Sequence, residues 1–267
     1  MTAQYLKNGN GRIAYEVAGD GQLVVCVPSL GDVRGEYRFL VPMLVEAGYR
    51  VAAMDVRGHG ETTTYWDDYS VVGVGQDILA LIRELDAGPA IIVGTSMGGG
   101  AAIWSAVEAP ELVRGIVMID PFVDGDGNRF FVTLLSIMLA RPWGPSMWLK
   151  YYSSLYPTRK PADFDEYTSA LYANLKQRGR LEATLEMLRA SKRASGERMP
   201  NLTQPVLVLM GSKDPDFKNP EAEARRVAEA VRGSYRIIEN AGHYPHAEMP
   251  EITGRLMLDF MHSLSKN

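Results

Sequence analysis

Residues 91–102 read IIVGTSMGGGAA, and the interpretation of the whole chain starts from this stretch. An apolar run ends at Gly94, Ser96 follows two residues later between glycines, and the apolar spacing then becomes that of a helix. The pattern G-x-S-x-G between a strand and a helix is typical of a serine held on a sharp, strained turn. Such a turn places the hydroxyl at the start of a helix, where backbone N–H groups attract negative charge. We therefore predict that Ser96 is a catalytic nucleophile.

Length, charge and cysteine content narrow the class of protein. The chain has 267 residues, a net charge of −4 and one cysteine, Cys26. This length suits one large domain, or one domain with an insertion. No Lys/Arg cluster suggests nucleic acid, no stretch approaches the ~18 apolar residues of a membrane span, and the N-terminus lacks a signal-peptide pattern. We expect a cytoplasmic protein, monomeric or homodimeric, that acts on a small-molecule substrate without nucleic acid or membrane.

Short apolar runs alternate with helical patterns along most of the chain, which favours a mainly parallel sheet with helices on both sides. The predicted strands cover residues 5–6, 12–17, 23–27, 50–54, 90–93, 116–119, 206–210 and 235–239, and the predicted helices cover residues 36–47, 70–85, 221–231 and 250–264. Between Phe122 and Pro200 there is no good strand. Helical patterns occur there at residues 130–139, 164–176 and 180–192. We predict a core of residues 1–121 and 201–267 with a helical cap inserted at 122–200.

Residues capable of catalysis follow four of the predicted strands. In a doubly wound sheet, ligands bind at the carboxyl ends of the strands. Ser29-Leu30-Gly31 follows the strand at 23–27, and Ser96 follows the strand at 90–93. Asp214 follows the strand at 206–210, and His243 follows the strand at 235–239. Serine, aspartate and histidine in this chain order are expected of a catalytic triad on this type of sheet.

Four motifs together resemble the α/β-hydrolase superfamily. They are GTSMG at 94–98, DVRGHG at 55–60, GSKD at 211–214, and GH at 242–243 with EMPE at 248–251. The resemblance covers the chain apart from the predicted cap. It implies an α/β-hydrolase fold with a mostly parallel eight-stranded sheet, no cofactor, Ser96 as nucleophile, Asp214 as acid and His243 as base. It also implies an oxyanion hole made by the backbone N–H groups of Met97 and Leu30, although many relatives have His-Gly at the Leu30 loop.

The chemistry of these residues agrees with the roles that the resemblance implies. Imidazole titrates near neutral pH, so His243 can take the proton of Ser96 and return it to the leaving group. Asp214 would fix the tautomer of His243 and stabilise the imidazolium. We therefore expect a carboxylesterase or lactonase that cleaves an ester, lactone or related acyl bond of a small, largely apolar substrate through an acyl-serine intermediate.

Several residue assignments have competitors within the sequence. Asp120, at the end of the strand at 116–119, and Asp216 are alternatives to Asp214 as the acid. His246 is a weaker candidate base than His243, because Gly242 suits a tight turn before His243. Among the remaining histidines, His59 is expected to be a turn residue near the site, and His262 a residue of the last helix. For Asp32 and Arg34 the sequence favours a solvated charged loop, with a place at the mouth of the pocket as the alternative.

Pocket residues and competing functions complete the expectations. Aromatic side chains of the cap suit an apolar pocket, and the candidate substrate contacts are Ser29, Phe122, Trp143 and Trp148. No paired histidines have metal-ligand spacing, so no metal is expected.

Three functions are alternatives to the expected carboxylesterase or lactonase. They are a carbon–carbon bond hydrolase, a cofactor-free haloperoxidase and a small-molecule receptor that keeps the triad. Serine at position 96 argues against the epoxide-hydrolase and haloalkane-dehalogenase branches, which resemble this chain but use aspartate there.

Overall fold

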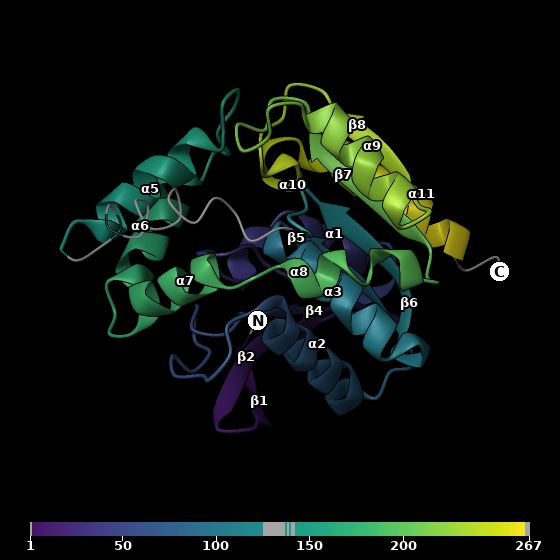
Figure 1. Ribbon diagram of the computed structural model, residues 1–267, viewed down its shortest axis with the longest axis horizontal. Helices are drawn as coiled ribbons and strands as arrows, with labels where there is room; N and C mark the ends of the chain where they lie inside the picture. The colour runs from purple at the N-terminus through teal and green to yellow at the C-terminus, as the bar shows by residue number, and fades with distance from the viewer. Residues whose placement is uncertain (1, 125–136, 138, 140–141, 265–267) are drawn as a thin grey trace.

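The computed structural model describes residues 2–124, 137, 139 and 142–264. An eight-stranded sheet with the order β1-β2-β4-β3-β5-β6-β7-β8 forms its centre (Figure 1). The strands are β1 Gln4–Asn8, β2 Gly11–Ala18, β3 Gln22–Val27, β4 Tyr49–Met54, β5 Ala90–Thr95, β6 Val113–Ile119, β7 Val206–Gly211 and β8 Ser234–Ile238. The pairs β1–β2 and β2–β4 are antiparallel, and all other neighbours are parallel. The mostly parallel eight-stranded sheet predicted from the sequence is confirmed.

Helices cover both faces of the sheet, because alternate side chains of each strand point in opposite directions. The core helices are α1 Leu40–Glu46, α2 Val71–Leu85, α3 Met97–Glu108, α9 Pro220–Ala230, α10 Pro245–Glu248 and α11 Pro250–Leu264. On one face, α2, α3 and α9 pack on side chains such as Val25 and Ile92. On the other face, α1 and α11 pack on side chains such as Val24 and Ile91. The strands of the centre are therefore buried on both sides, as their continuous apolar runs predict.

Within the described residues between β6 and β7 there are four α-helices, which we call the helical insertion. They are α5 Gly144–Ser154, α6 Phe164–Leu175, α7 Arg180–Arg189 and α8 Arg193–Gly196. In Figure 1, α5, α6 and α7 lie together at one side of the sheet, whereas α8 lies near α2 and α3. The helices predicted at 164–176 and 180–192 correspond to α6 and α7. The helix predicted at 130–139 lies outside the described residues, apart from residues 137 and 139.

Among the helices that differ from the sequence expectation, α1 and α5 have a clear physical reason. The helix expected at 36–47 is a short 3-10 turn, Arg34–Tyr37, followed by α1 from Leu40. No helix is predicted for residues 144–154, since Gly144 and Pro145 are residues typical of chain breaks. Proline is compatible with the first turn of a helix, where its missing N–H costs no intrahelical hydrogen bond. Pro145 occupies that position in α5, and so the proline begins a helix there.

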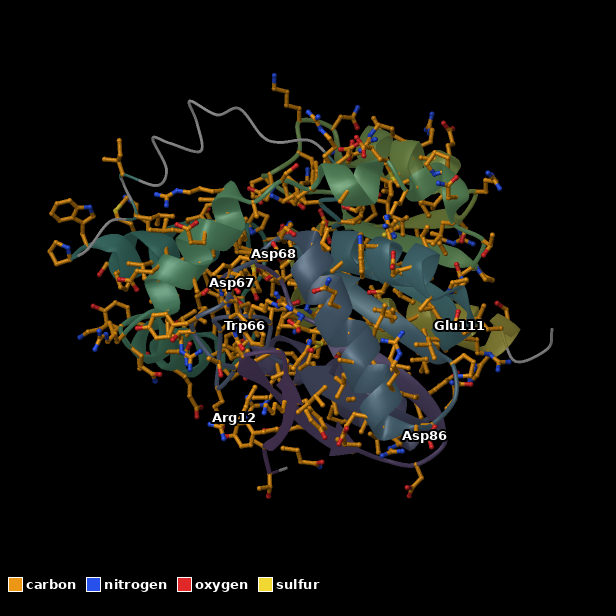
Figure 2. The ribbon with its side chains drawn as sticks, turned by 60° about the horizontal axis from the view of Figure 1, so that its bottom comes forward. Arg12, Trp66, Asp67, Asp68, Asp86 and Glu111 are labelled. Atoms are coloured by element: carbon orange, nitrogen blue, oxygen red, sulfur yellow. The ribbon has the colours of Figure 1, made fainter. Side chains whose placement is uncertain are left out.

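Figure 2 shows the two ends of the core helices. Trp66, Asp67 and Asp68 lie in the loop before α2, on the side of the helical insertion. Asp86 marks the opposite end of α2, and Glu111 lies beyond the end of α3. The carboxyl ends of the parallel strands thus face the insertion. Among the described helices, none is long and apolar enough to cross a membrane.

Candidate active site

Ser96 occupies a strained turn between β5 and α3. Its backbone has φ 54° and ψ −119°, in a region that non-glycine residues rarely adopt. The glycines on either side are required by close packing, since a Cβ at Gly94 would collide with the Gly98 carbonyl group, and a Cβ at Gly98 would collide with the Val27 carbonyl oxygen. The turn therefore places Ser96 at the first residue before α3, directly ahead of the Met97 N–H. The structure agrees with the strained serine turn that the G-x-S-x-G pattern indicates.

His243 and Asp214 lie together at the carboxyl ends of β8 and β7. His243 Nδ1 donates to Asp214 Oδ2 over 2.7 Å, and both side chains are buried. Phe122 connects this pair to the serine turn. Its backbone N–H donates to the Ser96 carbonyl oxygen over 3.1 Å, and its ring centroid lies 6.0 Å from that of His243. The three residues predicted as a triad are therefore brought to one region of the sheet edge.

The electrostatics of the pair favour an imidazolium–carboxylate arrangement. Burial opposes the charge on His243, but the Asp214 carboxylate outweighs it, with Asp216 and Glu36 adding to the effect, and raises the pKa of His243 to about 9. Burial also opposes the charge on Asp214, yet His243 and nearby hydrogen-bond donors hold the pKa of Asp214 below its ordinary value. The ring therefore keeps its Nδ1 proton toward Asp214, which leaves Nε2 as the atom that exchanges a proton with a substrate or nucleophile.

The competing acids have other partners. Asp216 accepts a hydrogen bond from the Tyr151 hydroxyl over 2.6 Å, and its backbone N–H donates to Asp214 Oδ1 over 2.9 Å. Asp120 accepts from the Gly211 N–H over 2.9 Å. Neither has a hydrogen bond to His243 among the contacts of the described residues. Of the three aspartates, Asp214 is the one positioned to orient the imidazole.

The other histidines have structural surroundings. His246, in α10, is fully buried, with Nε2 3.2 Å from Glu36 Oε1 and its ring stacked on Tyr37. His262, in α11, stacks on Tyr49 with ring centroids 6.3 Å apart. His59, in the turn after β4, is fully buried. Burial lowers the pKa of His59 to about 4, so its ring is neutral near pH 7.

The loop after β3 has most of its N–H groups already engaged. The Ser29 N–H donates to Glu36 Oε2 over 2.8 Å, and the Gly31 N–H donates to His59 Nε2 over 3.1 Å. Within the described part of the chain, no acceptor is bonded to the N–H of Leu30, and the same holds for Met97. Leu30 and Met97 are the two residues that the sequence analysis assigned to an oxyanion hole. The hydrogen bonds of their neighbours remove Ser29 and Gly31 as alternative donors.

Asp32 is fully buried, and the expectation of a solvated charged loop is therefore wrong. Its Oδ2 accepts from the Tyr152 hydroxyl over 2.8 Å, and its Oδ1 accepts from the Tyr167 hydroxyl. Both tyrosines belong to the helical insertion. Burial, together with Glu36, raises the pKa of Asp32 to about 7. Arg34 is not solvated either, because it forms ion pairs with Asp55, Glu16 and Glu61.

Helix α5 and the residues after it contact three loops of the site. The Trp148 ring packs so closely on Gly31 that a Cβ at this glycine would collide with it. Tyr151 donates to Asp216 beside Asp214, as described above. The Leu155 carbonyl oxygen accepts from the backbone N–H of His243 over 3.0 Å. The insertion thus contacts the loops that carry Leu30, Asp214 and His243 and helps to hold them in place.

The four candidate substrate contacts have different environments. Phe122 lies beside His243 and stacks on Phe217, with ring centroids 4.7 Å apart. Trp148 is buried against the loop after β3, and its indole Nε1 has no hydrogen-bond partner among the described residues. Ser29 is buried, and its hydroxyl contacts Glu36 and Tyr244, each at 2.8 Å. Trp143 is 55% exposed at the start of α5. Phe122 and Trp148 thus place aromatic rings beside His243 and beside the loop after β3, respectively.

Comparison with known proteins identifies the class to which this fold and site belong. The model of the alpha/beta hydrolase family matches residues 24–254, and the chain therefore belongs to the α/β-hydrolase family.

Individual relatives include proteins with different activities. The chain is 30% identical over 262 residues to the provisionally named non-heme bromoperoxidase BpoC of Mycobacterium tuberculosis, covering 94% of this chain and 98% of the relative. It is 29% identical over 235 residues to human monoglyceride lipase, covering 84% of this chain and 75% of the lipase. A thermophilic esterase from Thermogutta terrifontis has a similar structure, with a TM-score of 0.84, 21% identity and 99% of each chain covered. The family is thus established, and its members differ in the reaction for which they are named.

Proposed function

We propose that the protein is a serine hydrolase that cleaves an ester, lactone or related acyl bond through an acyl-serine intermediate. The observation that carries the proposal is the 2.7 Å hydrogen bond between His243 and Asp214, at the sheet edge that also holds the strained turn at Ser96. The lipase and esterase among the similar proteins support an acyl substrate. The roles of the three residues follow from their chemistry.

In the proposed reaction, Ser96 Oγ attacks the acyl carbon while His243 Nε2 takes its proton. Asp214 keeps the ring oriented and stabilises the imidazolium. The negative oxygen that forms would be bound by the N–H groups of Leu30 and Met97, which have no other described acceptor. His243 then returns the proton to the leaving group. Water, activated by the same ring, attacks the acyl-serine and releases the acid.

The helical insertion acts as a cap that sets substrate choice in this proposal. Residues 122–200 would form the cap, and residues 1–121 and 201–267 would form the catalytic core. Phe122 and Trp148 would contribute apolar surface beside His243 and the loop after β3. The Trp148 Nε1 group, buried without a described partner, can donate to a carbonyl or ether oxygen of the substrate. These features favour a small, largely apolar substrate that carries at least one acceptor oxygen.

Labelling with a fluorophosphonate tests the nucleophile directly. The reagent should phosphonylate Ser96, as located by mass spectrometry of peptides, and labelling should disappear in Ser96→Ala. Ser263→Ala, an exposed serine of α11, is the matched control and should label normally. Turnover of nitrophenyl esters should fall by about 10⁴-fold or more in Ser96→Ala. An adduct on another residue, or no adduct on a folded protein, would disprove the assignment.

The similarity to BpoC favours a cofactor-free haloperoxidase as the second candidate. The two reactions share the acyl-serine, which hydrogen peroxide attacks in place of water to give a peracid. Peroxide-dependent bromination in a carboxylate buffer, compared with ester hydrolysis by the same preparation, separates them. A carbon–carbon bond hydrolase would act on ring-cleavage products and leave simple esters intact. A receptor would bind a ligand with negligible turnover.

A further inference from the structure

Asp120 is a buried carboxyl group that the proposed reaction does not use. It follows β6, between the strands that lead to Ser96 and Asp214, and its backbone has φ 43°. The side chain is fully buried, and Oδ1 accepts from the Gly211 N–H over 2.9 Å. Oδ2 receives no hydrogen bond from any N–H or hydroxyl donor of the described residues. A buried carboxylate oxygen without a donor is costly, so this oxygen needs an explanation.

The neighbour of Asp120 is the carboxyl group of Asp214. One side-chain atom from each of Asp120, Asp214 and His243 lies within 4.8 Å of the others. A hydrogen bond between the two carboxyl groups would give Asp120 Oδ2 the partner that it lacks, and such a bond requires one proton between them. Two carboxylates this close in a dry site cannot both be ionised without a large energetic cost. One of the pair therefore holds a proton.

The surroundings decide which aspartate holds that proton. Asp214 is bonded to His243 Nδ1 and to the Asp216 N–H, two donors that favour its charged form. Asp120 has a single backbone donor. Burial, the charge of Asp214 and the more distant Glu248 raise the pKa of Asp120 well above its ordinary value, whereas the pKa of Asp214 is lowered. The proton therefore resides on Asp120.

We propose that Asp120 is a neutral carboxylic acid in the working protein and donates an O–H hydrogen bond to Asp214, which makes it a positioning residue for the His243–Asp214 pair. This inference rests on the proposed function only for the roles of those two residues. The bond gives the Asp214 carboxylate a third donor, after His243 and the Asp216 N–H, and so fixes the plane of the group. It also withdraws part of the negative charge that holds a proton on His243.

Asparagine at position 120 reproduces the neutral acid almost completely. Its Oδ1 can accept from the Gly211 N–H while its Nδ2 donates to Asp214, and asparagine tolerates the positive φ at this position. If Asp120 is neutral, Asp120→Asn leaves the pKa of His243 within about 0.3 units of the original value. Asp120→Ala removes the donor and should raise the pKa of His243 by about 0.5–1 unit.

NMR titration of His243 in protein labelled with ¹⁵N-histidine measures these shifts without any substrate. The other three histidines serve as internal references, and His243→Gln assigns the signal. Asp86→Asn and Asp86→Ala are matched controls at a residue with φ 40°, on the distant end of α2 (Figure 2), and should leave the titration unchanged. The pH dependence of ester turnover should move by the same amounts as the titration.

Three results would overturn the proposal. A fall of about one unit or more in the pKa of His243 in Asp120→Asn would show that the natural residue carries a negative charge. An unchanged pKa in a folded Asp120→Ala variant would show that no hydrogen bond was lost. A shift of the wild-type titration by EDTA would show a metal ion where we place the proton. If ester hydrolysis is absent, the proposed function fails, but the NMR titration still decides the state of Asp120.

Discussion

The sheet edge of the core and helix α5 of the insertion contribute to the same site by different means. The core supplies charge and backbone geometry: the turn at Ser96 with φ 54°, and the His243–Asp214 pair. Helix α5 and the residue Leu155 after it supply ring contacts, a hydroxyl group and one carbonyl oxygen. These groups contact the loops that carry Gly31, Asp216 and His243.

The reacting groups therefore belong to the core, whereas the positions of the loops that carry them depend partly on contacts with α5. Loss of a core group should abolish a step of the reaction, because no neighbour can replace a base or a nucleophile. Loss of an α5 contact should loosen a loop and leave the reacting groups intact. Core variants should therefore change the rate by orders of magnitude, whereas α5 variants should change stability and alignment by smaller amounts.

After the loss of the nucleophile itself, the largest effect is expected at the acid. Asp214→Asn should lower ester turnover by about 10³–10⁴-fold, because the amide favours the wrong tautomer of His243. Asp216→Asn, two residues away and bonded to Tyr151, is the matched control and should lose less than about tenfold. Steady-state kinetics on a nitrophenyl ester measure both. Equal losses of turnover in the two variants would contradict this comparison, because the contact of Asp216 with the insertion would then matter as much as the acid of the core.

The pH dependence should show the state of His243. Because its pKa is raised to about 9, the ring is protonated near pH 7 and must lose that proton to act as a base. kcat/KM should rise roughly tenfold per pH unit below the pKa and level off near pH 9. The same shift adds stability that is fully present below the unfolded pKa of about 6.5 and is lost as the pH rises through about 9. A profile already flat at pH 7 would contradict the assignment.

A smaller effect is expected where α5 meets the loop after β3. Gly31→Ala adds a methyl group against the Trp148 ring at φ 78°, and should cost about 2–4 kcal/mol of unfolding free energy from strain and overpacking combined. Gly88→Ala is the matched control, with φ 75° and open space around it, and should cost about 1–2 kcal/mol. Urea unfolding compares the two. Equal costs would show that the Trp148 contact contributes nothing.

The smallest effect is expected at the tyrosines that bind Asp32. Tyr152→Phe removes one of the two hydroxyl donors to this buried carboxyl group and should cost about 1–3 kcal/mol of unfolding free energy. Turnover should change by only a few-fold, because Tyr152 does not contact the reacting groups. Tyr65→Phe, at a tyrosine that is 66% exposed, is the control and should be neutral. A turnover loss as large as that of Asp214→Asn would place Tyr152 among the catalytic groups.

The sequence predicted the sheet and the candidate triad because both depend on local signals. A strand such as β5 is a short apolar run, and the turn at Ser96 needs glycines that stand next to it in the chain. Long-range partners carry no such signal. Asp32 is buried because Tyr152 and Tyr167, 120 and 135 residues away, supply its donors.

Helix α5 was missed for a local reason. The residues Pro142, Gly144 and Pro145 indicate chain breaks when each is considered alone, although Pro145 is placed in a first helical turn. The contact of Tyr151 with Asp216, 65 residues along the chain, was missed for the same long-range reason as Asp32. The spacing of Trp148 and Tyr152, one helical turn apart and both buried in α5, is a signal that favours this helix.

The buried ring of His59 makes the stability of the protein depend on pH in the acid range. Its Nδ1 faces the Arg57 carbonyl oxygen at 2.8 Å, so Nε2 is left to accept from the Gly31 N–H, whereas the Thr184 hydroxyl, 3.1 Å from Nε2, donates to the Arg180 carbonyl oxygen. Near pH 4 the ring gains a proton and Nε2 can no longer accept. The stability that the neutral ring provides is lost as the pH falls from about 6.5 through about 4. Acid should therefore weaken the attachment of the loop after β3, because the Gly31 N–H loses its acceptor.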